Sequence, residues 1–156
     1  MLILDTSAIL SGKFFSGAMA TTPKVIDEFK PGGHSWRLLQ YLRESGLKTM
    51  QPPSYAIEEV KKAAEKTGDI ASLSPADIEV LALAFHLKDS VLLTDDYAMQ
   101  NVAKELEIKW KGILEEGIKE KIYWMYRCAS CGRFFKKKYE TCPFCGGKVK
   151  KVRKKE

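Results

Sequence analysis

The four cysteines of this chain fall in two pairs, Cys128 with Cys131 and Cys142 with Cys145. Each pair encloses two residues, and ten residues separate the pairs. Such a pattern supplies four thiolates to one tetrahedral Zn²⁺, and the glycine after each second cysteine lets the backbone turn around the ion. Disulfides are the alternative, which a reducing cytoplasm disfavours. Because so short a segment cannot build a sufficient core alone, the pattern predicts a small domain that depends on structural zinc.

The net charge of the chain changes from negative to positive shortly before the cysteine segment. Residues 1–117 carry 13 Lys and Arg against 17 Asp and Glu, a net of −4, whereas residues 118–156 carry 13 against 3, a net of +10. We therefore predict an N-terminal domain of residues 1–117 followed by a zinc ribbon with a basic tail, residues 118–156. Clustered cations beside aromatic rings are typical of nucleic-acid binding, although a solvated face is the alternative. The candidate RNA-binding residues are Arg133, Lys136, Lys137, Lys138, Lys150 and Lys151.

In the first 117 residues, short apolar runs alternate with segments of helical periodicity. Strands are expected at 1–4, 18–21, 47–50, 90–94 and 108–110, and helices at 6–10, 22–29, 35–44, 55–66, 74–85 and 97–106. Alternation of this kind predicts an α/β fold, a parallel sheet flanked by helices. The apolar runs are too short for a membrane helix or a signal peptide, so we expect no membrane association and a cytoplasmic location.

Acidic residues recur where a strand ends or a helix begins. They are Asp5, Glu28, Asp77, Asp95 and Asp96. Strand ends and helix starts meet at one edge of a parallel sheet, so Asp5, Asp77 and the Asp95–Asp96 pair can converge there. Carboxylates held together repel one another unless a divalent cation compensates them, and oxygen ligands suit Mg²⁺ or Mn²⁺. The set predicts metal-dependent phosphodiester hydrolysis. Each acid has an alternative role, because Asp5, Asp77 and the Asp pair can cap helices and Glu28 can be a surface residue.

Four segments resemble the PIN domain, a metal-dependent ribonuclease fold, over about residues 1–110. They are Leu4-Asp5-Thr6-Ser7, Val25-Ile26-Asp27-Glu28, Ser74-Pro75-Ala76-Asp77-Ile78-Glu79 and Leu92-Leu93-Thr94-Asp95-Asp96. The resemblance implies catalytic roles for Asp5, Glu28, Asp77 and one of the two adjacent aspartates. The usual Thr-x-Asp spacing favours Asp96 as the metal ligand beside Asp5 and Asp77, while Asp95 stays open. It also implies Ser7 and Thr94 as supporting hydroxyl residues.

A PIN-like domain followed by a four-cysteine ribbon and a basic tail resembles the archaeal Nin-one-binding (NOB) endonucleases, which mature the 3′ end of small-subunit ribosomal RNA. The resemblance implies precursor ribosomal RNA on its ribosomal particle as substrate, with an assembly factor as a possible protein partner. Three alternatives stay open: a toxin-type PIN ribonuclease, which normally ends near the end of the PIN domain, a non-catalytic RNA-binding assembly factor, and a zinc-ribbon transcription accessory. The last would leave the convergent acids unexplained.

Overall fold

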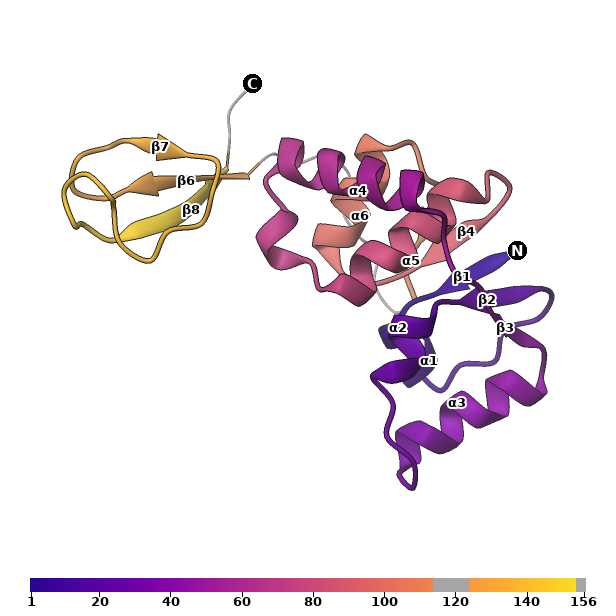
Figure 1. Ribbon diagram of the computed structural model, residues 1–156. Coiled ribbons are helices and arrows are strands. Elements are labelled where there is room, and N and C mark those ends of the chain that lie inside the picture. Colours follow the sequence, from indigo (N-terminus) through magenta and orange to yellow (C-terminus); the bar gives the residue numbers. More distant parts are fainter. Residues whose placement is uncertain (114–123, 154–156) are drawn as a thin grey trace.

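The computed structural model describes residues 1–113 and 124–153, which form two regions (Figure 1). We call residues 1–113 the α/β domain and residues 124–153 the cysteine ribbon. The expected boundary between residues 117 and 118 lies outside the described residues, as do Lys154 and Lys155 of the basic tail. Within the described part of the chain, none of the helices is long and apolar enough to cross a membrane.

The α/β domain contains a five-stranded parallel sheet in the order β3-β2-β1-β4-β5. Its strands are β1 (Leu2–Leu4), β2 (Met19–Thr21), β3 (Leu47–Thr49), β4 (Val91–Leu93) and β5 (Trp110–Lys111). The chain proceeds outward from β1 to β3, then crosses back to β4 on the other side of β1. The strand order therefore reverses between β1 and β4, and in an open α/β sheet the crevice at the carboxyl ends of two such strands is where ligands bind.

Helices cover both faces of this sheet. They are α1 (Thr6–Leu10), α2 (Pro23–Asp27), α3 (His34–Glu44), α4 (Ser54–Thr67), the 3₁₀ turn η1 (Ile70–Ser72), α5 (Pro75–His86) and α6 (Tyr97–Glu105). Right-handed crossovers on either side of the reversal place α1 and α3 on one face and α4, α5 and α6 on the other (Figure 1). α2 packs against α5. The fold class expected from the sequence is confirmed.

The core of the α/β domain is continuous across both faces of the sheet. Ile3 and Leu4 are adjacent in β1 and both are fully buried, which requires apolar neighbours above and below the strand. α5 is the central helix, as its nearly uniform apolar composition predicts, and its residues from Val80 to Ala84 are all buried. Burial on this scale stabilises the α/β domain without a ligand.

Most boundaries agree with the predictions to within one residue, and two elements differ by two residues at one end. The last strand of the sheet begins at Trp110, so Ile108 precedes it and is buried at the end of α6. Glu28 is the residue that follows α2, at its C-terminal cap, and the segment to Phe29 is not helical. The turn η1 was not predicted. This turn is closed by a hydrogen bond from the Ser72 N–H to the carbonyl oxygen of Asp69, the residue before η1, at 2.8 Å.

The cysteine ribbon is a three-stranded antiparallel sheet in the order β7-β6-β8. Its strands are β6 (Trp124–Cys128), β7 (Phe134–Phe135) and β8 (Val149–Arg153). The ribbon stands beside the C-terminal end of α4 (Figure 1), where Gly68 ends the helix with a φ of +85°. A Cβ atom at Gly68 would overlap the main-chain carbonyl of Trp124, so only glycine permits this close approach. Lys151 Nζ also donates to Ser72 Oγ at 3.0 Å across the junction.

Candidate functional site

The predicted acids line one pocket of about 520 Å³ at the carboxyl edge of β1 and β4. Its lining residues are Asp5, Thr6, Ser7, Leu10, Glu28, Ser74, Asp77, Asp95 and Asp96. Thus all five candidate catalytic acids, which span more than half of the chain, come to the point where the strand order reverses. Among the described residues, this lining includes no lysine or arginine.

Asp5 follows β1 and caps α1 through one oxygen. Its Oδ1 accepts hydrogen bonds from the backbone N–H of Ala8 at 2.9 Å and from Ser7 Oγ at 2.7 Å. The side chain is only 5% exposed, and burial raises the pKa of Asp5, although hydrogen bonds from Thr94, Ser7 and Ala8 oppose that rise. Ser7 and Thr94, which were predicted as supporting hydroxyl residues, therefore both contact Asp5.

Asp77 occupies the first turn of α5 in a reciprocal capping box. Its Oδ2 accepts from the backbone N–H of Ser74 at 2.9 Å, and Ser74 Oγ accepts from the backbone N–H of Asp77 at 3.1 Å. Burial is the main reason that the pKa of Asp77 is raised, and the negative charges of Asp96 and Glu28 raise it further. Neighbouring acids that disfavour each other's ionisation favour a bound cation.

The two adjacent aspartates have different local roles. Asp96 caps α6, since its Oδ1 accepts from the backbone N–H groups of Ala98 at 2.9 Å and Met99 at 3.2 Å. Asp95 Oδ1 instead accepts from the backbone N–H of Ile113 at 2.7 Å and so fastens the chain that leaves β5. Both remain in the pocket lining. Asp96 thus caps a helix as Asp5 does, whereas Asp95 holds the segment that follows β5.

Glu28 reaches the pocket from α2 and is held by a residue that the sequence analysis did not single out. Thr6 Oγ1 donates to Glu28 Oε2 at 2.6 Å and joins the start of α1 to the end of α2. Glu79, which is 3% exposed, accepts from the backbone N–H of Lys24 through Oε1 at 2.9 Å and anchors the N-terminal end of α2 to α5. The Ser-Pro-x-Asp-x-Glu spacing in α5 could have indicated Glu79, because it places that residue two positions after Asp77 on a central helix.

The donor set of this pocket suits a hard divalent cation. In Asp5, Asp77 and Asp96, the hydrogen bonds of the helix cap fall on one carboxylate oxygen of each. Among the described residues, the acids are not close enough together to form a single compact ligand cluster, so they surround the pocket instead. Mg²⁺ and Mn²⁺ suit such a site, because Mg²⁺ commonly keeps several waters and takes only one or two protein carboxylates. The donor set is therefore compatible with the metal-dependent chemistry that the resemblance to the PIN domain implies.

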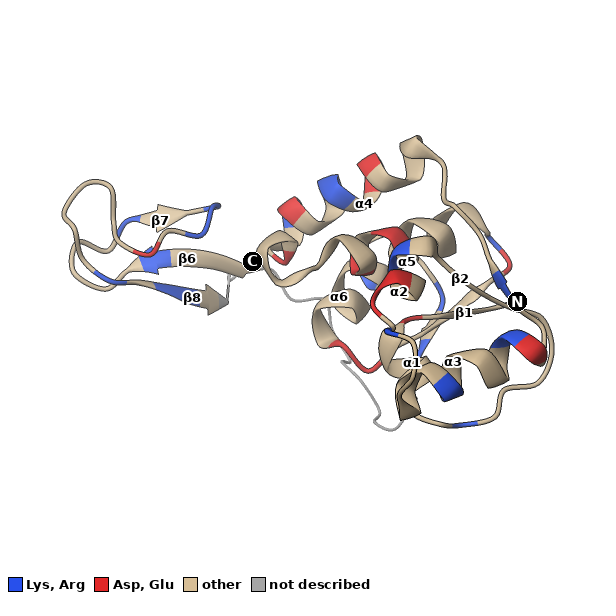
Figure 2. Cartoon of the chain, turned by 60° about the horizontal axis from the view of Figure 1, so that its bottom comes forward, with Lys and Arg blue, Asp and Glu red and all other residues tan. Residues whose placement is uncertain are grey.

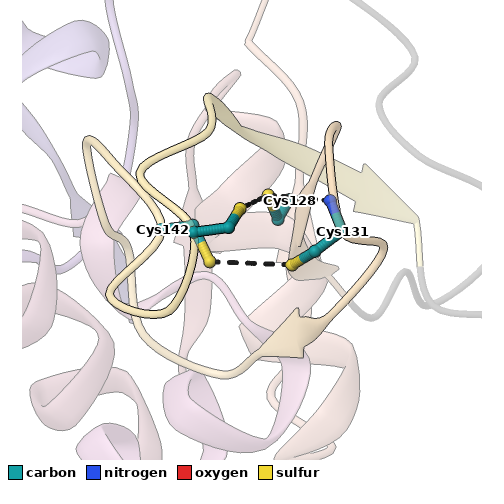
Figure 3. A group of neighbouring side chains, drawn as sticks. Cys128, Cys131 and Cys142 are labelled. Carbon is teal, nitrogen blue, oxygen red and sulfur yellow. Dashed lines mark hydrogen bonds between the residues drawn. The ribbon is translucent and has the colours of Figure 1, made fainter.

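The second candidate centre is the cysteine cluster, in which the ligand atoms of all four residues lie within 4.8 Å of one another (Figure 3). The Sγ atoms of Cys128 and Cys145 are 3.4 Å apart, and those of Cys131 and Cys142 are 3.7 Å apart. Zn–S bonds of about 2.3 Å in a tetrahedron require sulfur atoms roughly 3.8 Å apart. The backbone N–H of Cys131 is the main reason that the pKa of the Cys128 thiol is lowered to about 6. Four thiols in this arrangement fit one structural Zn²⁺.

Basic residues predominate in the cysteine ribbon, whereas the α/β domain contains both acidic and basic residues (Figure 2). The predicted RNA-binding residues are all exposed, and Lys151 spans the junction by its bond to Ser72. Neither histidine lines the acidic pocket. His86 instead hydrogen-bonds the Tyr55 hydroxyl through Nδ1 at 2.7 Å. The geometry therefore separates an acidic site that can hold a cation from a basic surface that can hold phosphates.

Comparison with known proteins finds a matching family and several similar sequences. The model of the PIN domain of ribonuclease matches residues 2–87. The chain is 47% identical to the endoribonuclease Nob1 of Pyrococcus abyssi, a match that covers 97% of this chain and 92% of that protein. It is 39% identical to the Nob1 of Archaeoglobus fulgidus, covering 94% and 87% of the two chains. It is also 34% identical to ribonuclease VapC1 of Thermoplasma acidophilum, covering 96% and 76%.

Proposed function

This chain belongs to the Nob1 endoribonuclease family and contains its PIN nuclease domain, and from that premise we propose that it cuts precursor small-subunit ribosomal RNA at its 3′ end during ribosome biogenesis. The enzyme is an endoribonuclease that hydrolyses phosphodiester bonds. The observation that carries the proposal is the convergence of Asp5, Glu28, Asp77, Asp95 and Asp96 on one pocket at the switch point of a parallel sheet.

We propose Mn²⁺ or Mg²⁺ as the catalytic cofactor, with Asp5, Asp77 and Asp96 as ligands. When bound, such an ion activates water and offsets the charge that develops on the phosphate. The helix caps hold the three aspartates in place before RNA arrives, so little reorganisation is needed. Glu28 is exposed and is oriented by the Thr6 hydroxyl, which suits it to accept a proton from the attacking water. The raised pKa of Asp5 and of Asp77 opposes metal loading at low pH.

The cysteine ribbon is proposed to hold the RNA while the α/β domain cuts it. Four thiolates complete the coordination of Zn²⁺, so that site leaves no open position for chemistry. The exposed lysines and Arg133 neutralise phosphates, which the acidic pocket alone repels. The proposed partners are precursor ribosomal RNA, its ribosomal particle and an assembly-factor protein, and the proposed location is the cytoplasm.

The test is cleavage of an RNA that spans the mature small-subunit 3′ end, by the wild-type chain and by Asp5→Asn. Asn caps helices as well as Asp, so the variant should keep its fold while losing a negative ligand. We expect a loss of at least about a hundredfold, because even partners outside the ligand sphere typically contribute 10–100-fold. Mn²⁺ and Mg²⁺ should be omitted by dialysis, with zinc content measured, since a chelator such as EDTA also strips the ribbon.

A metal-dependent cut that Asp5→Asn abolishes supports the nuclease and its site together. Absence of any cut by the wild type, with tight RNA binding retained and no rescue by precursor ribosomal particles, would instead favour the non-catalytic assembly factor. The match to ribonuclease VapC1 covers nearly all of this chain, so chain length does not separate a toxin-type ribonuclease from the ribosomal enzyme. The cut position does, because only the ribosomal enzyme should stop at the mature 3′ end.

A further inference from the structure

The cysteine ribbon ends at its surface in an exposed aromatic ring, that of Phe144. Phe144 lies between the two cysteines of the second pair and is 67% exposed, the largest fraction among the large hydrophobic residues described as exposed. The guanidinium carbon of Arg133 lies 4.3 Å from the centre of its ring. What distinguishes Phe144 from other exposed rings is the guanidinium beside it, because a ring and a guanidinium together offer a flat, positively charged surface on which an aromatic ligand can stack.

Other aromatic residues hold this ring in place. Phe135 of β7 stacks nearly parallel to Phe144, with an angle of 11° between the rings and 6.2 Å between their centres. Tyr139 packs edge-on against Phe135 at 5.1 Å. Across the strands, Phe135 pairs with Tyr126, which is 5% exposed. The result is a layered stack that begins in the buried part of the ribbon and ends at the surface with Phe144 and Arg133.

The surroundings of the stack favour a negatively charged, flat partner. Glu140 is the only acidic residue of the ribbon segment 124–153, against nine lysines and arginines. Unpaired RNA bases stack on aromatic rings and on arginine planes, while lysines take the phosphates. Within a duplex the base faces are already stacked on one another and are not available to such a platform.

We propose that Arg133 and Phe144 form a stacking platform for an unpaired RNA base, so that the ribbon selects loops or single strands over duplex. This deepens the proposed function and rests on it. The lysines of the ribbon then supply affinity that depends on salt and is insensitive to structure, and the platform supplies the preference for unpaired RNA. A surface for a protein partner is the competing interpretation, and the experiment distinguishes the two.

The test measures RNA binding by the full-length, zinc-loaded chain without Mn²⁺ or Mg²⁺, so that no cutting occurs. The probes are a single-stranded RNA and a fully paired duplex of equal length. Phe144→Leu keeps an apolar side chain but removes the ring, and we expect single-strand affinity to fall about tenfold with little change on duplex. The slope of log affinity against log salt should stay the same, because no phosphate contact is lost. Phe144→Trp should bind single strands at least as tightly as the wild type.

Two control variants show whether the change in RNA affinity is specific to the Phe144 ring. Lys150→Gln should weaken binding to both RNAs and reduce the salt slope by about one. Tyr41→Leu removes an aromatic ring that is 54% exposed on α3 of the α/β domain, and it should leave affinity for both RNAs unchanged. Measurements of zinc content and of the NMR spectrum check whether each variant keeps the ribbon folded. If Phe144→Leu loses zinc, Arg133→Lys takes its place, because it keeps the charge but lacks the flat guanidinium.

Equal single-strand binding by Phe144→Leu and the wild type would overturn the platform, as would an equal loss on single strand and duplex. A protein-docking role predicts the first of these outcomes. Failure of the platform is distinct from failure of the proposed function, because in the first case the wild-type chain still binds and cuts RNA.

Discussion

The two regions of this molecule are stabilised by different physical means. The α/β domain buries a continuous apolar core on both faces of its sheet, from Ile3 in β1 to Val102 in α6. Among the described residues of the cysteine ribbon, only Tyr126, Cys128 and Cys142 are buried, and two of these are zinc-ligand candidates. We therefore expect hydrophobic burial to stabilise the α/β domain and zinc coordination to stabilise the ribbon, so that each region responds to perturbations that leave the other intact.

Removal of zinc should produce the largest difference between the two regions. With a strong chelator, we expect the ribbon residues near 124–150 to lose their native fold completely, because metal binding supplies most of their folding free energy. The α/β domain should keep its native fold, because its core includes no cysteine. Amide NMR dispersion measures both regions in one sample. Dispersion retained by Tyr126 and its ribbon neighbours after zinc is gone would contradict this division.

Deletion of residues 118–156 should separate RNA affinity from catalysis. We expect RNA binding to weaken by more than about tenfold and its salt dependence to flatten, because the deletion removes 13 lysines and arginines. A control is Lys48→Gln with Lys61→Gln, at exposed positions of β3 and α4, which lowers the charge of the α/β domain and leaves the ribbon unchanged. Equal RNA affinity of the truncated and full-length chains would remove the ribbon from RNA binding.

Glu79 tests whether the acidic pocket depends on the core beneath it. Glu79→Ala should cost about 1–3 kcal/mol of unfolding free energy, because the Lys24 backbone N–H loses its acceptor. RNA cleavage should fall about tenfold as Glu28 at the end of α2 shifts. Glu79→Gln keeps an acceptor and should recover most of both. Glu59→Gln, at an exposed pair with Lys62, is the control and should change neither quantity.

Asp69 should give the smallest effect, a pH dependence of stability. Burial raises the pKa of Asp69, whose Oδ2 accepts from Thr67 Oγ1 and Asn101 Nδ2, each at 2.7 Å, while its buried Oδ1 has no hydrogen-bond partner within residues 1–113 and 124–153. The folded state thus binds a proton more readily than the unfolded state. The contribution of the Asp69 carboxyl to the free energy of unfolding should fall as the pH rises from about 4 through the raised pKa. Above that pKa it should stay level. Denaturant titrations of wild type and Asp69→Asn across this range measure the difference, and parallel curves would contradict it.

The sequence predicted the order of strands and helices in the α/β domain because each has a strong local pattern. The Ser74-Pro75 start of α5 and the apolar run around Leu92 are examples, and both lie where expected. The convergence of the acids followed from the parallel topology. The resemblance to the PIN and NOB families is confirmed by the comparisons. The assignment of each acid to metal binding stays a prediction.

What local patterns could not predict depends on contacts between distant residues. The bond from the Lys24 backbone to Glu79 joins residues 55 positions apart, and no periodicity encodes it. Likewise, the hydrogen bond from Ile113 to Asp95 distinguishes two adjacent aspartates that look equivalent in the sequence. The exposure of Phe144 depends on how the cysteine pairs fold around each other, and its spacing alone gave no indication of it.

The double use of the acids has an evolutionary consequence. Asp5 and Asp96 each begin a helix, and Asp77 completes the capping box of α5, with the same side chains that we propose as metal ligands. Asparagine begins helices equally well and differs from aspartate by a single nucleotide in the codon. One mutation can therefore silence the enzyme while the domain still folds and the ribbon still carries its positive charge. An inactive variant of such a protein would then keep its fold and its basic ribbon. Selection could retain it as an RNA-binding protein without catalytic activity.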